Sequence, residues 1–169
     1  MTRGTLAYAE YDFDGNCFQI KVSDEFNGDM GPDMAMGEKT LQRLAKASTP
    51  DHFEKAVYDT VHDFGYEDYY DSEDPADMMF IDNGPTNTGM GLKDDPFKMS
   101  VPDVLERMFN YSDYEYIMSY GAPFYVEDKN GKLVTIEPGT VYVFSFCKYV
   151  GKADKDGNFI DETEDKEYS

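Results

Sequence analysis

The chain has 169 residues, of which 40% are hydrophobic and 15% aromatic, and its thirty-five acidic and fifteen basic residues give a formal charge of −20. A chain of this length buries roughly 70% of its unfolded surface, and its apolar content excludes a disordered protein. The charge argues against direct binding of nucleic acid or of an anionic membrane, because both need a basic surface, and it favours a partner protein with a basic surface.

The first predicted element is a hairpin over residues 4–23. Leu6 and Tyr8, and then Phe18 and Ile20, recur with the period of two that is typical of strands, and Asp14-Gly15 supplies the turn. Residues 24–37 are rich in Gly, Pro, Asp and Met, which predicts a loop.

Two helices are predicted next. Residues 38–47 place Leu41 and Leu44 on one stripe, and Thr49-Pro50-Asp51 is a helix start signal with an N-cap hydroxyl and a proline in the first turn. The second helix is expected to end at Gly65 and to turn four acids toward water: Asp51, Glu54, Asp59 and Asp63.

The remaining elements alternate between apolar runs and segments rich in Gly and Pro. We expect a short strand within residues 77–82, a loop over residues 83–98, a helix capped by Ser100 and a short helix from Ser112 with Ile117 and Met118 inward. The C-terminal third predicts a hairpin around Lys129–Lys132, one long strand over residues 140–150 and a turn at Asp156-Gly157.

This order of elements predicts a single α+β domain over residues 1–160, followed by a flexible acidic tail over residues 161–169. We expect an antiparallel sheet of about five strands, made of the N-terminal hairpin, the C-terminal hairpin and the long strand, packed with three or four helices.

No sequence pattern identifies a catalytic site. The chain contains no phosphate-binding, nucleophile or metalloprotease motif, and His52 and His62 are ten residues apart, which is not the spacing of a metal-binding pair. The DKDGN segment at 154–158 does not fit an EF-hand and is interpreted as a hairpin turn. We therefore expect no catalytic residue, no metal and no cofactor, although an enzyme with paired carboxylates stays open.

The two cysteines and the N-terminus bear on localisation. Cys17 and Cys147 lie in strand-like runs without a CxxC partner, so we interpret them as buried thiols in a reducing compartment. The first residues include no apolar leader segment, which predicts a cytoplasmic protein.

The most unusual segment is GYEDYYDSEDPAD at residues 65–77, with six carboxylates, three tyrosines and no Lys or Arg. Two interpretations are open. The segment is either a solvated loop whose tyrosines fold over the core, or an anionic contact surface whose carboxylates pair with Lys or Arg of a partner while the tyrosines add contact area.

On composition, and on segments such as EDYYDSEDPAD and DETEDKEY, the chain resembles the nucleic-acid-mimicking inhibitors of phages and mobile elements, including antirestriction and anti-CRISPR proteins. The resemblance implies that carboxylates replace phosphates in the DNA-binding groove of a nuclease or host-defence protein. The partner-binding residues predicted on this basis are Asp59, Asp63, Glu67, Asp68, Tyr69, Tyr70, Asp71, Glu73, Asp74, Asp77, Asp103 and Glu106.

The spacing of the acids limits this hypothesis. The acids of 67–77 would lie about 7 Å apart in an extended chain, whereas duplex DNA carries one charge per ~1.7 Å of its axis. Mimicry of a duplex would therefore need further acids from the outer faces of the helices, among which we expect Asp51, Glu54, Asp113 and Glu115.

Two other functions stay open. The chain could be a small enzyme or ligand-binding domain whose site is lined by loops 27–37 and 83–98, or an assembly protein that self-associates through its aromatic residues; the sequence does not predict the oligomeric state. A concave pocket with converging polar groups would favour a ligand-binding domain, and rows of carboxylates on a convex face would favour the acidic inhibitor.

Overall fold

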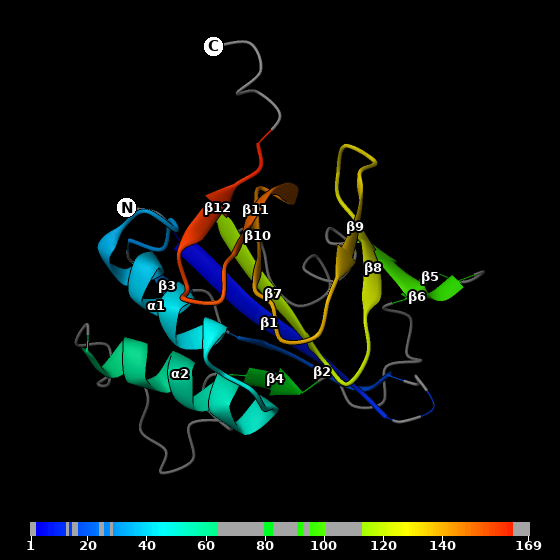
Figure 1. Cartoon of the computed structure of the whole chain (residues 1–169), viewed down its shortest axis with the longest axis horizontal. Helices are drawn as coiled ribbons and strands as arrows, with labels where there is room; N and C mark the ends of the chain where they lie inside the picture. Colours follow the sequence, from blue (N-terminus) through cyan, green and yellow to red (C-terminus); the bar gives the residue numbers. More distant parts are fainter. Residues whose placement is uncertain are drawn as a thin grey trace.

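The computed structural model describes residues 3–12, 14, 17–23, 26–27, 29–63, 80–82, 91–92, 95–100 and 113–163. Within these residues the fold is α+β, as predicted, with two helices, α1 (Ala35–Ala45) and α2 (Pro50–Asp63). The strands in chain order are β1 (Arg3–Tyr11), β2 (Cys17–Ser23), β3 (Phe26–Asn27), β4 (Phe80–Asp82), β5 (Gly91–Leu92), β6 (Asp95–Ser100), β7 (Tyr114–Tyr120), β8 (Phe124–Glu127), β9 (Leu133–Ile136), β10 (Tyr142–Ser145), β11 (Lys148–Ala153) and β12 (Phe159–Asp161) (Figure 1).

The strands form two sheets. The large sheet has the order β12-β11-β10-β7-β1-β2-β4, with β3 also paired to β1, and the small sheet has the order β5-β6-β8-β9. Most neighbours are antiparallel, but β1–β7 and β6–β8 are parallel pairs, so both sheets are mixed. The predicted hairpins 4–23 and 122–137 both form, and they lie in different sheets.

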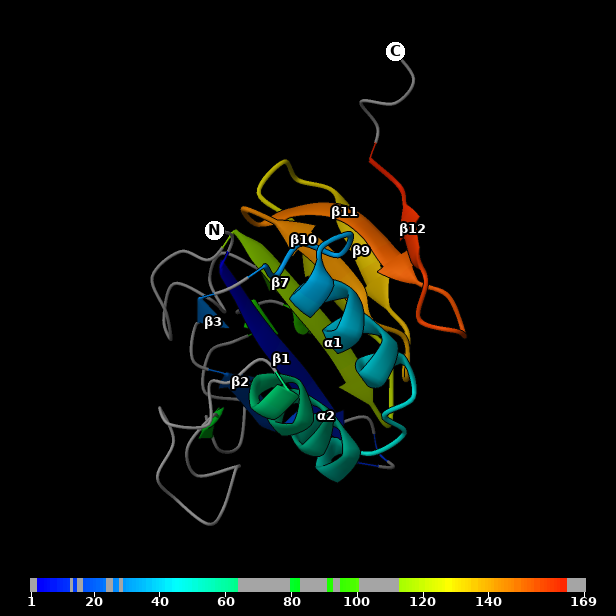
Figure 2. The ribbon, with the colours of Figure 1, turned by 90° about the vertical axis from the view of Figure 1, so that its left-hand side faces the viewer.

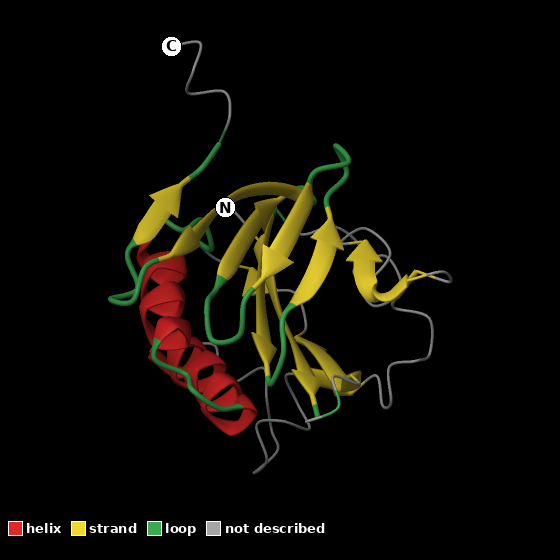
Figure 3. Cartoon of the chain, turned by 45° about the vertical axis from the view of Figure 1, so that its right-hand side comes forward, coloured by secondary structure: helices red, strands yellow, loops and turns green. Residues whose placement is uncertain are grey.

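The large sheet lies between the two helices and the small sheet. Figure 2 shows α1 and α2 side by side over the face of β1 and β7, and Figure 3 shows the helices on the side of the large sheet away from β8 and β9. Alternation along β1 explains this arrangement, because Leu6 and Tyr8 pack toward the helices while Ala7 and Ala9 pack toward the small sheet.

Aromatic residues dominate the core beneath the helices. Phe53 of α2 is fully buried and lies edge-on to Tyr8 and Tyr120, with ring centroids 5.0 Å and 6.5 Å away. The buried Tyr120 hydroxyl donates to the Ala47 carbonyl at 2.8 Å, and the Tyr116 hydroxyl donates to the Met30 carbonyl. These two hydrogen bonds join the central strand β7 to the segments at both ends of α1.

The start of α1 depends on a close backbone approach. A Cβ on Gly37 would lie 1.9 Å from the Gly31 carbonyl oxygen, so only glycine fits in this first turn. The helix begins at Ala35, three residues before the predicted start. The predicted start of α2 is confirmed, since Pro50 is its first residue and the Thr49 hydroxyl accepts the His52 N–H at 3.2 Å.

Two predictions for the second half of the chain are wrong. Residues 114–120 form β7 and not a helix from Ser112; β7 lies between β1 and β10 and is buried on both faces, so it lacks the alternation that marks a strand in sequence. The long strand predicted over 140–150 is two strands, β10 and β11, joined by a turn at Phe146-Cys147.

Other predictions are confirmed in part or lie outside the described residues. Residues 80–82 form the predicted strand β4, but part of the predicted loop 83–98 forms β5 and β6. The helix predicted after Ser100 falls on residues 101–112, outside the described residues, and Ser100 itself ends β6. The predicted count of three or four helices is therefore not confirmed.

Candidate functional site

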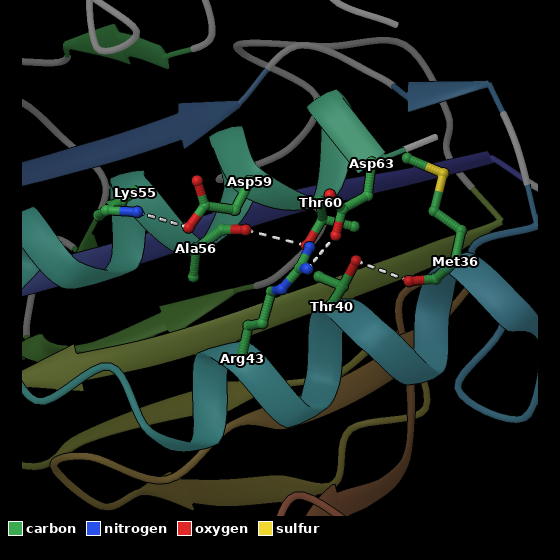
Figure 4. A network of polar contacts seen from close by, with 8 residues as sticks. All are labelled: Met36, Thr40, Arg43, Lys55, Ala56, Asp59, Thr60 and Asp63. Atoms are coloured by element: carbon green, nitrogen blue, oxygen red, sulfur yellow. Dashed lines mark hydrogen bonds and ion pairs between the residues drawn. The ribbon is translucent and has the colours of Figure 1, made fainter. Parts of the chain in front are cut away.

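The helical layer contains two of the predicted partner-binding residues, and both are ion-paired. Asp59 accepts from the Lys55 ammonium at 2.7 Å along α2, and Asp63 accepts from the Arg43 guanidinium of α1 (Figure 4). Arg43 also donates to the Thr60 hydroxyl at 3.0 Å, so it joins the two helices. These acids are therefore balanced by basic residues of the same layer.

The remaining predicted contact residues lie outside the described part of the chain, so their role stays a prediction. They comprise Glu67, Asp68, Tyr69, Tyr70, Asp71, Glu73, Asp74 and Asp77 in the acidic segment, with Asp103 and Glu106 in the predicted third helix.

The structure corrects the position of two acids that were expected on outer helix faces. Glu54 is only 9% exposed and pairs with Lys21 of β2 at 2.9 Å, so it faces the sheet. Glu115 is 2% exposed and belongs to β7, where it lies inside the molecule. Asp51, in contrast, is exposed as expected.

The predicted turn at 154–158 is confirmed. The Asp154 carboxylate accepts the N–H groups of Asp156 and Asn158, each at 2.9 Å, and Gly157 has a φ of 83°. These backbone hydrogen bonds lower the pKa of Asp154, and the one from Asn158 has the largest effect. Within the described residues no group of three or more His, Cys, Asp or Glu side chains could hold a metal ion.

A cavity of about 580 Å³ lies at the tips of two neighbouring hairpins. Its walls come from the β8–β9 turn, the β10–β11 turn, the first residues of β11 and Thr163. The tips of these two hairpins lie at the same end of the protein in Figures 1 and 2. None of the described lining residues comes from loop 27–37, which we expected to line a ligand site.

Three lysines and two aromatic residues line the cavity. Lys129 and Lys132 come from the β8–β9 turn and Lys148 from the start of β11. The Lys132 ammonium lies 5.2 Å from the ring centroid of Tyr149, and the Tyr149 hydroxyl donates to Glu162 at 2.6 Å. Among the described residues, neither Lys129 nor Lys148 forms an ion pair.

The β10–β11 turn presents the second aromatic residue, Phe146, in an unusual conformation. Phe146 and Cys147 have φ values of 49° and 65°, the left-handed region that hairpin turns normally fill with Asn or Gly. The Phe146 side chain is 53% exposed at the edge of the cavity. A bulky, exposed aromatic residue at such a position costs of order 1–3 kcal/mol, and residues of this kind cluster at functional sites.

Asp128 fixes the cavity wall from inside. Its side chain is 5% exposed, and it accepts the N–H groups of Asn130 and Lys132 through Oδ1 at 2.9 Å and that of Tyr149 through Oδ2 at 3.0 Å. The Lys129 N–H also donates to the Cys147 carbonyl at 3.0 Å. The two turns are thus held together by hydrogen bonds between the sheets.

Glu115 lies beneath the β10–β11 turn. Its Oε1 accepts the Cys147 N–H at 3.1 Å and the Cys147 thiol at 3.4 Å, while its Oε2 has no partner among the described residues. Burial raises the pKa of Glu115 to about 8, against the hydrogen bonds from Cys147, which lower it. Cys147 therefore lies in a half-buried turn, and the prediction of a buried strand position is wrong for it.

The cavity residues were missed by sequence reasoning. The sequence predicts only a hairpin turn for the KNGK lysines, and it predicts one continuous strand through Phe146, Lys148 and Tyr149. The nearest available signal is the lysine between aromatic residues in FCKY, but only the fold brings this segment to the KNGK turn.

Comparisons with protein-family models, with curated proteins and with solved structures each found no match. The resemblance to acidic inhibitors therefore rests on composition alone. No helix of the described residues has both the length and the apolar character that crossing a membrane would require.

Proposed function

We propose that this protein binds the basic, nucleic-acid-binding surface of a partner protein, as a DNA- or RNA-mimicking inhibitor of a nuclease or host-defence system. The distribution of charge supports this proposal. Residues 35–63 carry five acids and four Lys or Arg, whereas residues 64–79 carry six acids and neither Lys nor Arg. The segment that follows α2 thus carries six of the twenty surplus negative charges, whereas the helical layer carries one.

The burial of Glu54 and Glu115 refines which nucleic acid would be mimicked. Both residues are withdrawn from the outer surface, and Asp59 and Asp63 are ion-paired, so the helical layer adds little free negative charge to the segment. Six acids spaced up to about 7 Å apart are too sparse for a duplex.

A groove for a single strand is the better match. Such grooves combine basic residues with aromatic side chains on which bases stack. A segment that alternates carboxylates with Tyr66, Tyr69 and Tyr70 offers counterparts to both phosphates and bases. Electrostatic steering would make association fast and dependent on salt.

A displacement experiment tests the proposal. A fluorescent single strand and a fluorescent duplex are bound to each member of a panel of nucleases, and the protein is titrated in while anisotropy is followed. We expect displacement of the single strand from at least one nuclease, with an apparent affinity that falls about tenfold or more between roughly 50 and 200 mM salt.

Two variants with equal charge changes give the control. The first neutralises the segment by Asp→Asn and Glu→Gln changes at Glu67, Asp68, Asp71, Glu73, Asp74 and Asp77. The second makes the same changes at six exposed acids elsewhere: Asp14, Asp29, Asp33, Glu38, Glu137 and Asp156. We expect the first variant to lose displacement and the second to keep it. Equal loss in both variants, or an affinity unaffected by salt, would contradict the proposal.

A further inference from the structure

The described residues that line the cavity between the β8–β9 and β10–β11 turns carry a net positive charge, opposite in sign to that of the whole protein. Three of these residues are lysines, and the one carboxylate among them, Asp128, accepts hydrogen bonds from three backbone N–H groups. Lysine ammonium groups are suited to phosphate, which they bind as point charges. In a protein with a formal charge of −20, such a cluster indicates a local site for an anion.

The aromatic residues indicate that the anion carries a planar ring. The Phe146 ring is exposed and held in a costly backbone conformation, and the Tyr149 ring lies beside the Lys132 ammonium. Aromatic side chains form platforms on which nucleic-acid bases stack. An inorganic anion would use the lysines but would leave the position of Phe146 unexplained.

The size and construction of the cavity agree with a small molecule. Its volume of about 580 Å³ falls in the range of small-molecule sites and exceeds what a lone phosphate ion would fill. Its walls are fixed by Asp128 and by the hydrogen bond from Lys129 to the Cys147 carbonyl, so little ordering is needed when a ligand binds.

We propose that this cavity binds a nucleoside phosphate, with Lys129, Lys132 and Lys148 contacting the phosphates and the Phe146 and Tyr149 rings contacting the base. The described lining residues belong to 128–163 and not to the acidic segment of 65–77, and this proposal does not depend on the function proposed above.

Calorimetric titration with ATP, without added metal, tests the assignment. We expect saturable binding with a dissociation constant of about 1 mM or lower. Adenosine, which lacks the phosphates, and pyrophosphate, which lacks the ring, are each expected to bind about tenfold more weakly or worse. No saturation by ATP, or binding of pyrophosphate as tight as that of ATP, would overturn the proposal.

Two substitutions separate the site from general effects of charge and folding. Lys132→Met and Phe146→Gly are each expected to weaken ATP binding about fivefold or more. Phe146→Gly is also expected to raise the melting temperature, because glycine accepts a φ of 49° without strain, so lost binding cannot be attributed to unfolding.

The matched controls are an exposed lysine and an exposed tyrosine that do not line the cavity. Lys155→Met and Tyr125→Ser should leave ATP affinity unchanged. ATP affinity in Lys132→Met and Phe146→Gly equal to that of the two controls would place the ligand elsewhere and overturn the proposal. Tighter binding of a short single-stranded oligonucleotide than of ATP would overturn it in favour of a nucleic-acid site.

Discussion

The helical layer and the cluster of turns around the cavity are built in opposite ways. Beneath α1 and α2 the interior is aromatic and aliphatic, around Phe53, and the charged groups are ion-paired, at the surface between Arg43 and Asp63 and at the edge of the core between Glu54 and Lys21. At the turns the carboxylates of Asp128 and Glu115 are inside and the Phe146 ring is outside. An arrangement of this second kind costs stability, and proteins tolerate such local conflicts chiefly at functional sites.

The largest effect is expected from removing the carboxylate that holds the two turns together. Asp128→Ala deprives three backbone N–H groups of their acceptor, and we expect a loss of about 3 kcal/mol in the free energy of unfolding. Urea unfolding measures this change.

Asp128→Asn is the matched variant. Its amide oxygen still accepts the N–H groups of Asn130 and Lys132, but its amide nitrogen cannot accept that of Tyr149. We therefore expect Asp128→Asn to lower the free energy of unfolding about half as much as Asp128→Ala does. A loss below about 0.5 kcal/mol for Asp128→Ala, the size of an ordinary surface change, would show that the turns do not depend on this buried group.

The comparison also shows what the sequence could predict. The hairpin over 4–23 follows from period-two alternation and an Asp-Gly turn, and the start of α2 follows from Thr49-Pro50, because each is set by neighbouring residues. The helical layer was therefore largely predictable. Glu54 was misplaced because its position near the edge of the apolar stripe brings it within reach of Lys21 on β2, a contact that only the fold supplies.

The turn cluster could not be predicted in this way. Phe-Cys is not a turn sequence, so nothing in residues 140–150 indicates that the strand reverses at Phe146-Cys147. The parallel pairing of β1 with β7 joins residues more than a hundred positions apart, and it is this pairing that buries Glu115. The reversal at Phe146-Cys147 is what brings Phe146, Lys148 and Tyr149 to the cavity.

The next effect concerns Glu115 and depends on pH. Burial raises its pKa from 4.5 in the unfolded chain to about 8. The charges of Asp113 and Lys129 have weaker effects: Asp113 raises the pKa and Lys129 lowers it. Between these pH values the folded protein keeps a proton that the unfolded chain releases. The contribution of Glu115 to the free energy of unfolding is therefore fully present below pH 4.5, and it is lost as the pH rises toward 8.

Glu115→Gln removes this titration while keeping an oxygen that can accept the Cys147 N–H. We expect the wild-type free energy of unfolding to fall, relative to the variant, by about 3 kcal/mol between pH 5 and pH 8. Urea unfolding at several pH values measures the difference between the two proteins. Parallel curves over this range would mean that the buried carboxyl ionises as freely as an exposed one.

The smallest effect is expected in the helical layer, from Arg43→Met. The Arg43 and Asp63 side chains are 28% and 47% exposed, and the buried Thr60 hydroxyl keeps its hydrogen bond to the Ala56 carbonyl when the guanidinium is removed. Methionine retains most of the apolar stem of arginine, so we expect the free energy of unfolding to fall by about 0.5 kcal/mol. This loss should be smaller at high salt. Lys55→Met, which breaks the more exposed pair with Asp59, should cost still less. A cost for Arg43→Met as large as that of Asp128→Ala would reverse the comparison, because it would make a surface ion pair as important to this fold as a buried carboxylate.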